Sequence, residues 1–422
     1  MTDPHHDPAF PSLHGRPARG WLNDPNGLAL VDGRYHVFFQ HNPDDPVHHR
    51  IAWGHVSSAD LVTWREEPLA LVARDGEPDA FGCWTGCLVV DDGVPTAVYS
   101  AVERGPGGHA EVLLARGSAD LRTWDQGSTP VVALPDDPEV TEVRDPFCFS
   151  AFGRRWAVQG AGREGGTPRV LVYGCDDLER WEPHGTLLDG TDPVAASVAP
   201  AEVWECPNLV QVDGTWVLVV SLWRRRGEGR STLDGVRYLV GDLDLTDGGP
   251  RFRPTGGGEL DGGEAFYAPQ LLATDDRVLL WGWAKEEGRD EDHVREAGWS
   301  GALTFARELA VVDGVVVARP APELEALRAE VISTSEPLSH TSFEVVHRGG
   351  AGSLVLADDA GETEVHRWDE GARVLVDGSV VEAFATDGAG APVTLRPYPT
   401  ATSTWVVRTT GGELTAWRLA VP

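Results

Sequence analysis

Cysteine is scarce in this chain and forms no recognisable pattern. The sequence contains five cysteines, an odd and scattered set made up of Cys83, Cys87, Cys148, Cys175 and Cys206. Such a set argues against a disulfide framework and is typical of free thiols in a reducing compartment. Cys83 and Cys87 have no second Cys or His pair at ligand spacing, so they do not predict a zinc site. We expect small buried thiols instead.

Positively charged residues are also scarce relative to negatively charged ones. The chain has 35 Lys and Arg against 66 Asp and Glu, a formal net charge of −31. This charge repels phosphate backbones and anionic membranes, so roles on nucleic acid or on a membrane surface are disfavoured and a neutral ligand is expected. The first residues lack a basic stretch followed by an apolar one, and no transmembrane segment is evident. We therefore expect a cytoplasmic protein.

Glycine and proline are abundant, whereas helix-forming segments are rare. The 422 residues include 49 Gly and 30 Pro, and 41% of the chain is hydrophobic. Short Val-rich strands alternate with Asp-Gly and Gly-Gly turns, which predicts an all-β protein. The length is more than one such domain usually needs, so two domains are expected.

A strand pattern recurs about every 60 residues, a period typical of propellers and solenoids. Its five copies open at Gly33, Gly93, Gly153, Gly214 and Asp276. The sequence Asp-Leu-x-x-Trp repeats behind three of them and ends at Trp64, Trp124 and Trp181. We therefore predict a five-bladed β-propeller, with these tryptophans in the blade cores. The strand before each opening would line a central channel.

Three acids share one phase of this repeat. Asp24, Asp145 and Glu205 each stand eight or nine residues ahead of the Gly that opens a copy. In a propeller they would converge on one point, where like charges cost stability and raise one another's pKa. We therefore interpret the cluster as functional. A proline follows each acid within two residues and stiffens the backbone, as expected at the start of an inner strand.

A domain boundary is expected where Pro320 and Pro322 interrupt the pattern. Residues 1–319 would form the propeller, residues 320–330 a connecting segment with the one clear helix of the chain, and residues 331–422 a small β-sandwich. In this last part, two Val-rich strands flank Asp377-Gly378, a two-residue hairpin signal. No comparable cluster of acids occurs there, which indicates a structural companion to the propeller.

Two carboxylates across a pocket are the minimum for cleaving a glycosidic bond, and a third can stabilise positive charge. The proton donor needs apolar or anionic neighbours that raise its pKa, and the nucleophile needs donors that keep it ionised. Glu205 stands between an indole and a thiol, and Asp24 lies near two amides; these flanking residues are Trp204, Cys206, Asn23 and Asn26. On this basis Glu205 is assigned as general acid/base and Asp24 as nucleophile.

The other two copies carry uncharged residues at the same phase. Trp84-Thr85 and Tyr267 can stack or hydrogen-bond, so we expect them to contact substrate. Six of the tryptophans outside the Asp-Leu-x-x-Trp repeat are candidates for a sugar-stacking wall: Trp21, Trp53, Trp84, Trp204, Trp283 and Trp299.

Together these segments resemble glycoside hydrolase family 32, the β-fructosidases that include invertases, levanases and sucrose-6-phosphate hydrolases. The motifs are Trp-Leu-Asn-Asp-Pro-Asn-Gly at residues 21–27, Arg-Asp-Pro at residues 144–146 and Glu-Cys at residues 205–206. The resemblance implies a five-bladed propeller with a C-terminal β-sandwich. It also implies a retaining mechanism in which Asp24 forms a fructosyl-enzyme, Glu205 is acid/base and Asp145 stabilises the transition state. Implied sugar contacts are Asn23, Gln40, Trp53, Arg144 and Trp283, with Thr85 in place of a serine.

Two features do not follow simply from this pattern. Adjacent strand residues point to opposite faces, so Asp145 facing the channel would turn Arg144 away unless the strand begins irregularly there. The run Arg224 to Arg226 is interpreted as a solvated loop, with a site for a phosphorylated sugar as the alternative.

The resulting hypothesis is an exo-acting β-fructosidase that cleaves a terminal fructosyl unit from sucrose or a short fructo-oligosaccharide, without metal or organic cofactor. Sucrose 6-phosphate is an alternative substrate. Two other hypotheses stay open: a non-catalytic carbohydrate-binding propeller whose acids only hydrogen-bond hydroxyls, and a propeller that transfers the glycosyl unit to phosphate. An arabinosidase or xylosidase is disfavoured by residues 21–27. The preferred fructoside, the balance of hydrolysis and transfer, and the oligomeric state are not fixed by the sequence.

Overall fold

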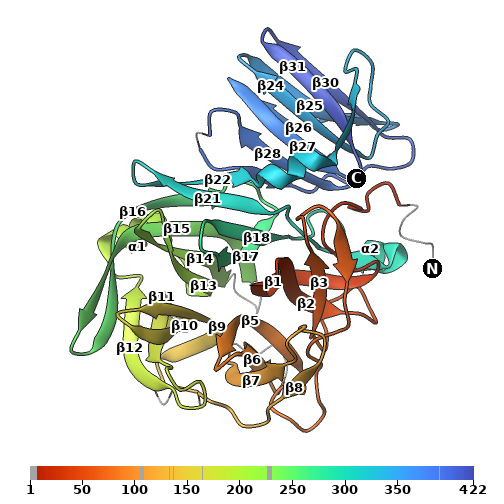
Figure 1. Ribbon diagram of the computed structural model, residues 1–422. Coiled ribbons are helices and arrows are strands. Elements are labelled where there is room, and N and C mark those ends of the chain that lie inside the picture. The colour runs from red at the N-terminus through yellow and green to blue at the C-terminus, as the bar shows by residue number, and fades with distance from the viewer. Residues whose placement is uncertain are drawn as a thin grey trace.

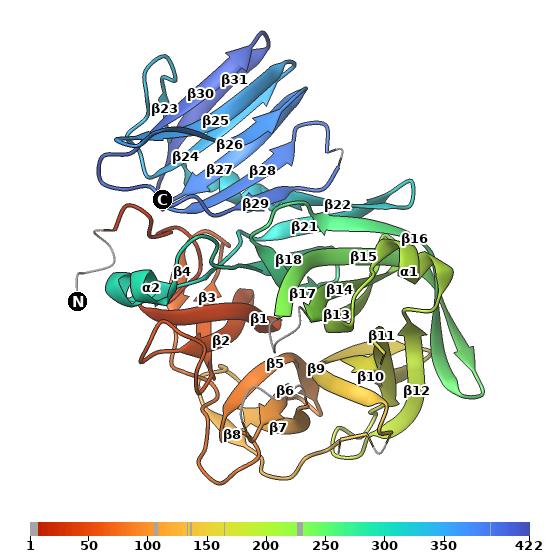
Figure 2. The same cartoon turned by 180° about the vertical axis from the view of Figure 1, so that it is seen from behind.

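The computed structural model of the protein is mostly β, as the composition predicts (Figure 1). It describes residues 7–104, 109–132, 134–135, 137–163, 165–225, 231–388 and 390–422. Sheets built from residues 20–320 lie around a common centre, and two further sheets stand to one side of them (Figures 1 and 2). No helix in the described part of the chain is both long and apolar enough to cross a membrane.

Four sheets surround the centre. The first contains β1 (Gly20–Val31), β2 (Arg34–Asn42), β3 (Ala52–Ser58), β4 (Trp64–Glu66) and β19 (Trp299–Ser300). The second contains β5 (Gly82–Asp91), β6 (Val94–Val102), β7 (Glu111–Gly117) and β8 (Trp124–Gln126). The third contains β9 (Val140–Ala151), β10 (Arg154–Arg163), β11 (Thr167–Gly174), β12 (Glu182–Asp189), β13 (Val203–Val212), β14 (Thr215–Arg225), β15 (Ser231–Thr246) and β16 (Gly249–Asp261). The fourth contains β17 (Phe266–Ala273), β18 (Val278–Ala284), β20 (Ala302–Leu303), β21 (Arg307–Val312) and β22 (Val315–Pro320).

The innermost strands form a ring. β1, β5, β9, β13 and β17 contact one another in this order, and β17 contacts β1. The parallel pairing of Gly20 in β1 with Trp299 in β19 ties the chain near residue 300 back to its first strand. The predicted strand patterns coincide with the second strand of each repeat, β2, β6, β10, β14 and β18, so these five predictions are confirmed.

Four of the inner strands reach the next strand through a two-residue turn. In the first of these turns, Asp32 and Gly33 have φ angles of 48° and 73°. A tight hairpin that follows the natural strand twist needs positive φ at both central positions, and glycine adopts it without strain. The regular spacing of Asp-Gly pairs in the sequence therefore reflects the regular spacing of these hairpins.

The Asp-Leu-x-x-Trp repeat forms the connection before the outermost strand. In its first copy, the Asp60 side chain accepts hydrogen bonds from the backbone N–H groups of Val62 and Thr63. The leucines of the repeat are fully buried, whereas its tryptophans are half-buried and pack against the apolar cores from outside. The leucines are thus the true core residues of this motif.

Helices are few, but the expectation of one clear helix was wrong. The described residues contain two α-helices, α1 (Pro193–Val198) and α2 (Glu291–Ala297), and each starts at an aspartate whose side chain caps it, Asp192 or Asp290. The predicted helix after Pro320 is a 3-10 helix, Pro322–Leu327, and β23 begins at Arg328. Leu324 and Leu327 are buried there, so docking of one face, not helix propensity, sets its length.

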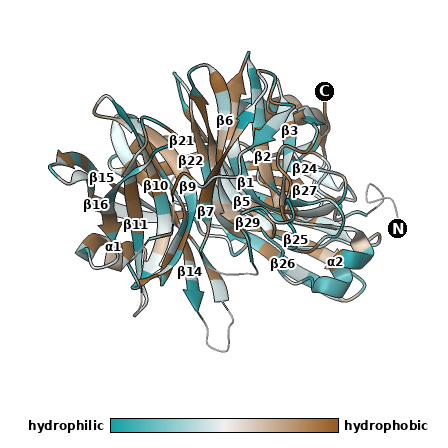
Figure 3. Cartoon of the chain, turned by 90° about the horizontal axis from the view of Figure 1, so that it is seen from below, coloured by the Kyte–Doolittle hydropathy of each residue, from teal (hydrophilic) through white to brown (hydrophobic). Residues whose placement is uncertain are grey.

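The C-terminal part folds as two sheets around a separate core. The larger contains β23 (Arg328–Ile332), β31 (Glu413–Leu419), β24 (Ser342–Arg348), β27 (Gly371–Asp377), β28 (Val380–Ala385) and β29 (Val393–Leu395). The smaller contains β26 (Gly361–Trp368), β25 (Ala351–Asp358) and β30 (Thr404–Thr410). β27 and β28 pair across Gly378, which confirms the predicted hairpin. Figure 3 shows apolar colours along the strands, whereas α2 is hydrophilic.

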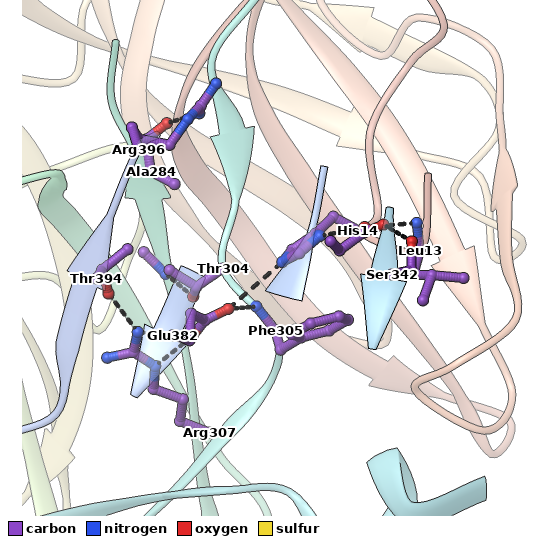
Figure 4. A network of polar contacts seen from close by, with 12 residues as sticks. Leu13, His14, Ala284, Thr304, Phe305, Arg307, Ser342, Glu382, Thr394 and Arg396 are labelled. Carbon is purple, nitrogen blue, oxygen red and sulfur yellow. Dashed lines mark hydrogen bonds and ion pairs between the residues drawn. The ribbon is translucent and has the colours of Figure 1, made fainter. Parts of the chain in front are cut away.

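Buried charges join the two parts of the molecule. Arg307 in β21 is completely buried and pairs with Asp261 at 2.7 Å and with Glu382 of β28 at 2.6 Å. Glu382 also accepts a hydrogen bond from the Phe305 backbone N–H and faces His14 (Figure 4). Because an unpaired charge at such a site is strongly unfavourable, this network fixes how the larger C-terminal sheet docks.

Candidate active site

The three acids singled out in the sequence line one cavity. Asp24 lies on β1, Asp145 on β9 and Glu205 on β13, three strands of the inner ring. The cavity has a volume of about 460 Å³, enough for a sugar-sized ligand. Six of the predicted substrate contacts also line it: Asn23, Gln40, Trp84, Arg144, Tyr267 and Trp283.

The spacing of the sequence repeat reappears as hydrogen bonds between neighbouring strands. Thr85 bonds Asp24, and the backbone N–H of Cys206 bonds Asp145, each across 61 residues. Arg144 bonds Glu205 across the same interval. Equivalent positions on adjacent inner strands therefore face each other, which is why residues of one phase meet at one cavity.

The strand register shifts at each acid, and such a bulge interrupts the regular alternation of side chains. Opposite Asp145, the β9–β10 register shifts between Val158 and Gly160, and Asp145 has a φ of 61°. A bulge breaks the strict alternation of side chains along a strand. Arg144 and Asp145 can therefore both line the cavity. The expected irregularity is present, but it lies within β9, which begins at Val140.

The prolines after the acids were expected at the start of the inner strands, but they do not lie there. Pro25, Pro146 and Pro207 all lie inside β1, β9 and β13. The register of β13 shifts between Glu205 and Asn208, on either side of Pro207. At a bulge the backbone N–H does not need to donate a hydrogen bond to the neighbouring strand. Proline, which has no N–H, is therefore tolerated there in the middle of a strand.

Asp24 is held by three side-chain donors. Thr85 donates to Oδ2 at 2.6 Å, Gln40 donates to Oδ2 at 3.1 Å and Asn23 donates to Oδ1 at 3.0 Å. Burial raises the pKa of Asp24 to about 6; the bonds from Thr85 and Asn23 oppose this rise, and the charge of Glu205 adds to it. The carboxylate is therefore the main form at neutral pH.

The pKa of Asp145 is raised further than that of Asp24. Burial raises its pKa to about 7, Arg144 and the Cys206 backbone N–H lower it, and the charges of Glu205 and Asp24 raise it further. The Cys206 N–H donates to Oδ2 at 2.9 Å, and the Asp145 backbone N–H donates to Ser100 Oγ at 2.8 Å. These bonds hold the strained residue in one orientation.

Glu205 is gripped from two neighbouring strands. Arg144 donates to Oε1 through Nε at 3.0 Å and through Nη2 at 2.9 Å. Tyr267 on β17 donates its hydroxyl to Oε2 at 2.6 Å. Charge-assisted bonds of this kind fix the direction of a carboxylate as well as its charge.

Of the flanking residues used to assign the acids, Asn23 contacts Asp24 as inferred, but Trp204, Cys206 and Asn26 do not have the inferred contacts. Trp204 is fully buried on the far side of β13, where its indole N–H donates to the Ala199 carbonyl at 2.8 Å. Cys206 Sγ lies 3.5 Å from Asp145 Oδ2, not beside Glu205. Asn26 is also fully buried, and its amide is best satisfied by the Pro25 carbonyl and the Gln40 N–H. The bulges change which side chains meet, so only some of the sequence neighbours are also neighbours in the cavity.

Three of the six candidate tryptophans form an aromatic wall. Trp21, Trp84 and Trp283 line the cavity, and the rings of Trp21 and Trp283 are 5.8 Å apart. The other three candidates, Trp53, Trp204 and Trp299, are fully buried and do not line it.

Two expected substrate contacts stand behind the cavity wall. The Trp53 indole N–H donates to the Trp84 carbonyl at 3.0 Å, so Trp53 supports the aromatic wall from behind. Thr85 is also absent from the cavity lining. Its hydroxyl accepts a bond from Gln40 at 2.7 Å and donates to Asp24, so it acts on the acid directly.

Five cavity residues were not anticipated from the sequence: His48, Glu142, Trp223, Ser231 and Leu233. His48 packs edge-on against Trp21 and Trp84, and burial lowers its pKa to about 4, so it is neutral at physiological pH. It lies between β2 and β3, where no periodic pattern marks it. Glu142 is two positions before Arg144 on β9, a spacing that places both on one face and that could have identified it.

Two arginines of the run, Arg224 and Arg225, are already paired. Arg224 Nε lies 2.9 Å from Asp234 Oδ2, and Arg225 Nη2 donates to Glu142 Oε1 at 2.8 Å. Arg226 lies outside the described residues. The five cysteines are free thiols, four of them buried, as expected.

The chain is similar to known proteins over most of its length. The model of the glycosyl hydrolases family 32 N-terminal domain matches residues 14–320. A sucrose-6-phosphate hydrolase of Klebsiella pneumoniae is 34% identical over 421 residues, covering 91% of this chain and 88% of that protein. A raffinose invertase of Escherichia coli is 29% identical, covering 93% and 90%. The structure of a family 32 β-fructofuranosidase of Bombyx mori superposes with a TM-score of 0.81 at 25% identity, covering 98% of this chain and 94% of that one.

Proposed function

The chain belongs to glycoside hydrolase family 32 and is a glycoside hydrolase, and from this premise we propose that it releases terminal β-fructosyl units from sucrose or short fructo-oligosaccharides. The observation that carries the proposal is the meeting of three carboxylates from three inner strands in one cavity beside an aromatic wall. Such a cavity can hold one sugar ring against the indoles while two acids act on its glycosidic bond.

In the proposed first step, the Asp24 carboxylate attacks the anomeric carbon of the fructosyl unit. Glu205 donates its proton to the glycosidic oxygen as the bond to the leaving sugar breaks. In the second step, Glu205 takes a proton from water, the water oxygen attacks the same carbon and Asp24 is released. The donors Thr85, Gln40 and Asn23 support the assignment of Asp24, because they favour its ionised form.

Asp145 has a different proposed task. It accepts the Cys206 backbone N–H and lies close enough to Asp24 and Glu205 for their charges to raise its pKa. We assign it to the fructosyl hydroxyls and to the positive charge that develops at the ring in the transition state. Asn23, Gln40, Trp84, Arg144, Tyr267 and Trp283 are the proposed contacts to the rest of the sugar.

The fold proposal is a five-bladed propeller over residues 1–319, a connecting segment over residues 320–330 and a β-sandwich over residues 331–422. The ring of contacts between the inner strands supports five blades. The parallel pairing of β19 with β1 supports closure of the circle between the last and first blades. The separate apolar core around Phe343 and Trp405 supports an independent second domain.

A second cavity beside the first supports an uncharged leaving group. It has a volume of about 450 Å³ and shares Trp21, Leu233 and Trp283 with the catalytic cavity. Its remaining lining residues are Thr232, Asp234, Lys285, Glu286 and Glu287. Lys285 forms an ion pair with Glu287, so acids outnumber unpaired cations at this position. An uncharged leaving group such as glucose fits this balance better than a phosphorylated one.

Sucrose 6-phosphate is the second candidate substrate. It is favoured by the similarity to the Klebsiella pneumoniae protein, which is named a sucrose-6-phosphate hydrolase. A phosphate group would require cations that are free to bind it. Arg224 and Arg225 are instead paired with Asp234 and Glu142, which supports the unphosphorylated substrate.

The test is a product assay with the purified protein on sucrose, sucrose 6-phosphate, inulin, levan and an aryl arabinoside, each with and without inorganic phosphate. We expect fructose release from sucrose that is independent of phosphate, with a higher kcat/KM than for sucrose 6-phosphate. Asp24→Ala should lower kcat on sucrose by at least about a thousandfold while the thermal unfolding curve is unchanged. Sugar binding without any cleavage would favour a non-catalytic propeller, and release that depends on phosphate would indicate phosphorolysis.

A further inference from the structure

The acid assigned as proton donor is the inner end of a chain of ion pairs that reaches the cavity rim. Arg225 Nη2 donates to Glu142 Oε1 at 2.8 Å, and Arg144 Nη1 donates to Glu142 Oε2 at 3.0 Å. The other two nitrogens of Arg144 hold Glu205 Oε1. The order of charges from the rim inward is therefore Arg225, Glu142, Arg144, Glu205.

We infer that Glu142 and Arg225 are positioning residues that act on the proton donor through Arg144. The inference rests on the proposed function, because it concerns how Glu205 works as acid and base. Glu142 contacts neither Glu205 nor Asp24 in any hydrogen bond among the described residues, so its influence must pass through the guanidinium between them. With one edge of Arg144 held by Glu142, the Nε–Nη2 edge is turned toward Glu205.

The three inner side chains in this chain of ion pairs are largely buried, which strengthens the interactions between their charges. The side chains of Arg144, Glu142 and Glu205 are 6%, 11% and 15% exposed, whereas that of Arg225 is 55% exposed. Burial lowers the pKa of Arg144, but the charges of Glu205, Asp145 and Glu142 outweigh this effect and raise it, so Arg144 stays cationic. Charges in a buried site act on one another more strongly than in water.

Glu142 and Arg225 have opposite effects on the proton held by Glu205. Glu142 offsets part of the Arg144 charge, and its loss would favour the ionised form of Glu205. Arg225 offsets part of the Glu142 charge, and its loss would favour the protonated form. The charged and titratable groups near Glu205 are Arg144, Tyr267, Asp24, Asp145, Cys206 and Glu142. Only Glu142 and Arg225 are removed in the test, so the other contributions are held constant.

The experiment measures kcat/KM for sucrose against pH in Glu142→Gln, Arg225→Gln and the double variant. General-acid catalysis needs a protonated donor. Loss of the donor's proton at high pH therefore sets the alkaline limb of the curve of kcat/KM against pH. We expect this limb to move down by about one pH unit in Glu142→Gln and up by a smaller amount in Arg225→Gln. The double variant should match Glu142→Gln, because Arg225 acts through Glu142.

A second measurement distinguishes a positioning role from a general loss of activity. Glu142→Gln should slow sucrose cleavage several-fold but leave cleavage of p-nitrophenyl β-fructofuranoside nearly unchanged, because nitrophenolate leaves without a proton. Glu142→Asp should restore part of the sucrose rate. The matched control is Glu362→Gln, which removes an exposed partner of Arg408 at 2.6 Å in the C-terminal sheets and should change neither limb nor rate.

Three results would overturn the inference: alkaline limbs that stay in place in both single variants, limbs that move in the same direction, or equal slowing on both substrates. None of these results bears on the proposed function, which is tested by fructose release in the unaltered protein and its loss in Asp24→Ala. Thermal unfolding of each variant shows whether it is folded, and the surface variant Arg225→Gln keeps the test available if Glu142→Gln is unstable.

Discussion

At the scale of single residues, the acids show how burial and hydrogen bonding oppose each other. Burial raises the pKa of Asp24 and favours its protonated form, and the donors around it work against that effect. Thr85 makes the shortest of these bonds, 2.6 Å to Oδ2. The ionised fraction of the proposed nucleophile therefore depends on a hydroxyl that does not itself line the cavity.

Replacing Thr85 with valine tests this dependence. The change keeps the shape of the side chain but removes the donor, so the pKa of Asp24 should rise above its value of about 6. Because Asp24 must be ionised to attack, the acid limb of kcat/KM should move to higher pH by about one unit, with little change in rate above pH 8. Thr85→Ser keeps the hydroxyl and should leave the limb in place. An unchanged limb in the valine variant would mean that Thr85 does not control Asp24.

The three acids that meet in the cavity could be predicted, but many of the residues that contact them could not. Asp24, Asp145 and Glu205 stand out because three acids share one phase of a repeat. His48 lies in an irregular connection, so its contact with Trp21 depends on tertiary structure alone. Three of the four neighbours proposed for Asp24 and Glu205, namely Asn26, Trp204 and Cys206, were wrong for a second reason. They assumed regular alternation along strands that contain bulges.

At the scale of secondary-structure elements, the hairpins were predictable and the bulges were not. An Asp-Gly turn imposes its own backbone geometry and is visible in the sequence. A bulge depends on how two strands pair: Cys206 and Ala268 have φ angles of 48° and 44° although neither residue favours positive φ. The surrounding sheets must hold such residues in place, which is a property of the folded ring.

The first hairpin gives a test of the turn argument. Gly33 has a φ of 73°, and a Cβ atom added there would meet nothing within 4 Å. Gly33→Ala should therefore cost only the backbone strain of the left-handed region, about 1 kcal/mol of unfolding free energy. Gly33→Asn should cost less, because asparagine adopts this region more readily. Urea unfolding followed by tryptophan fluorescence would measure both. Equal stability of the alanine variant and the unaltered protein would contradict the turn assignment.

At the scale of the whole molecule, docking of the C-terminal sheets depends on charges that are distant in the sequence. His14 lies before the first strand, yet its ring is 2.7 Å from Asp377 Oδ2 and 3.4 Å from Glu382 Oε1 (Figure 4). Arg307 completes the set from β21. No sequence pattern indicated this network, because each member stands alone in its own segment. The chain length and the prolines at positions 320 and 322 predicted two parts but not the contacts that fix them together.

The same network predicts how stability depends on pH. Burial lowers the pKa of His14, but hydrogen bonds and charges from Asp377 and Glu382 outweigh that effect and raise it above the ordinary value of 6.5. A raised folded-state pKa stabilises the protein fully below the unfolded value, and the stabilisation is lost as pH rises through the folded value. The melting temperature should therefore fall as pH rises above 6.5, and His14→Gln should flatten this part of the profile. His293→Gln is the matched control, because His293 also lies against an aspartate, at 2.6 Å, but on an exposed helix. If both variants kept the slope of the unaltered protein, His14 would not be the group that titrates, and the buried charges would have to hold the sheets together without its proton.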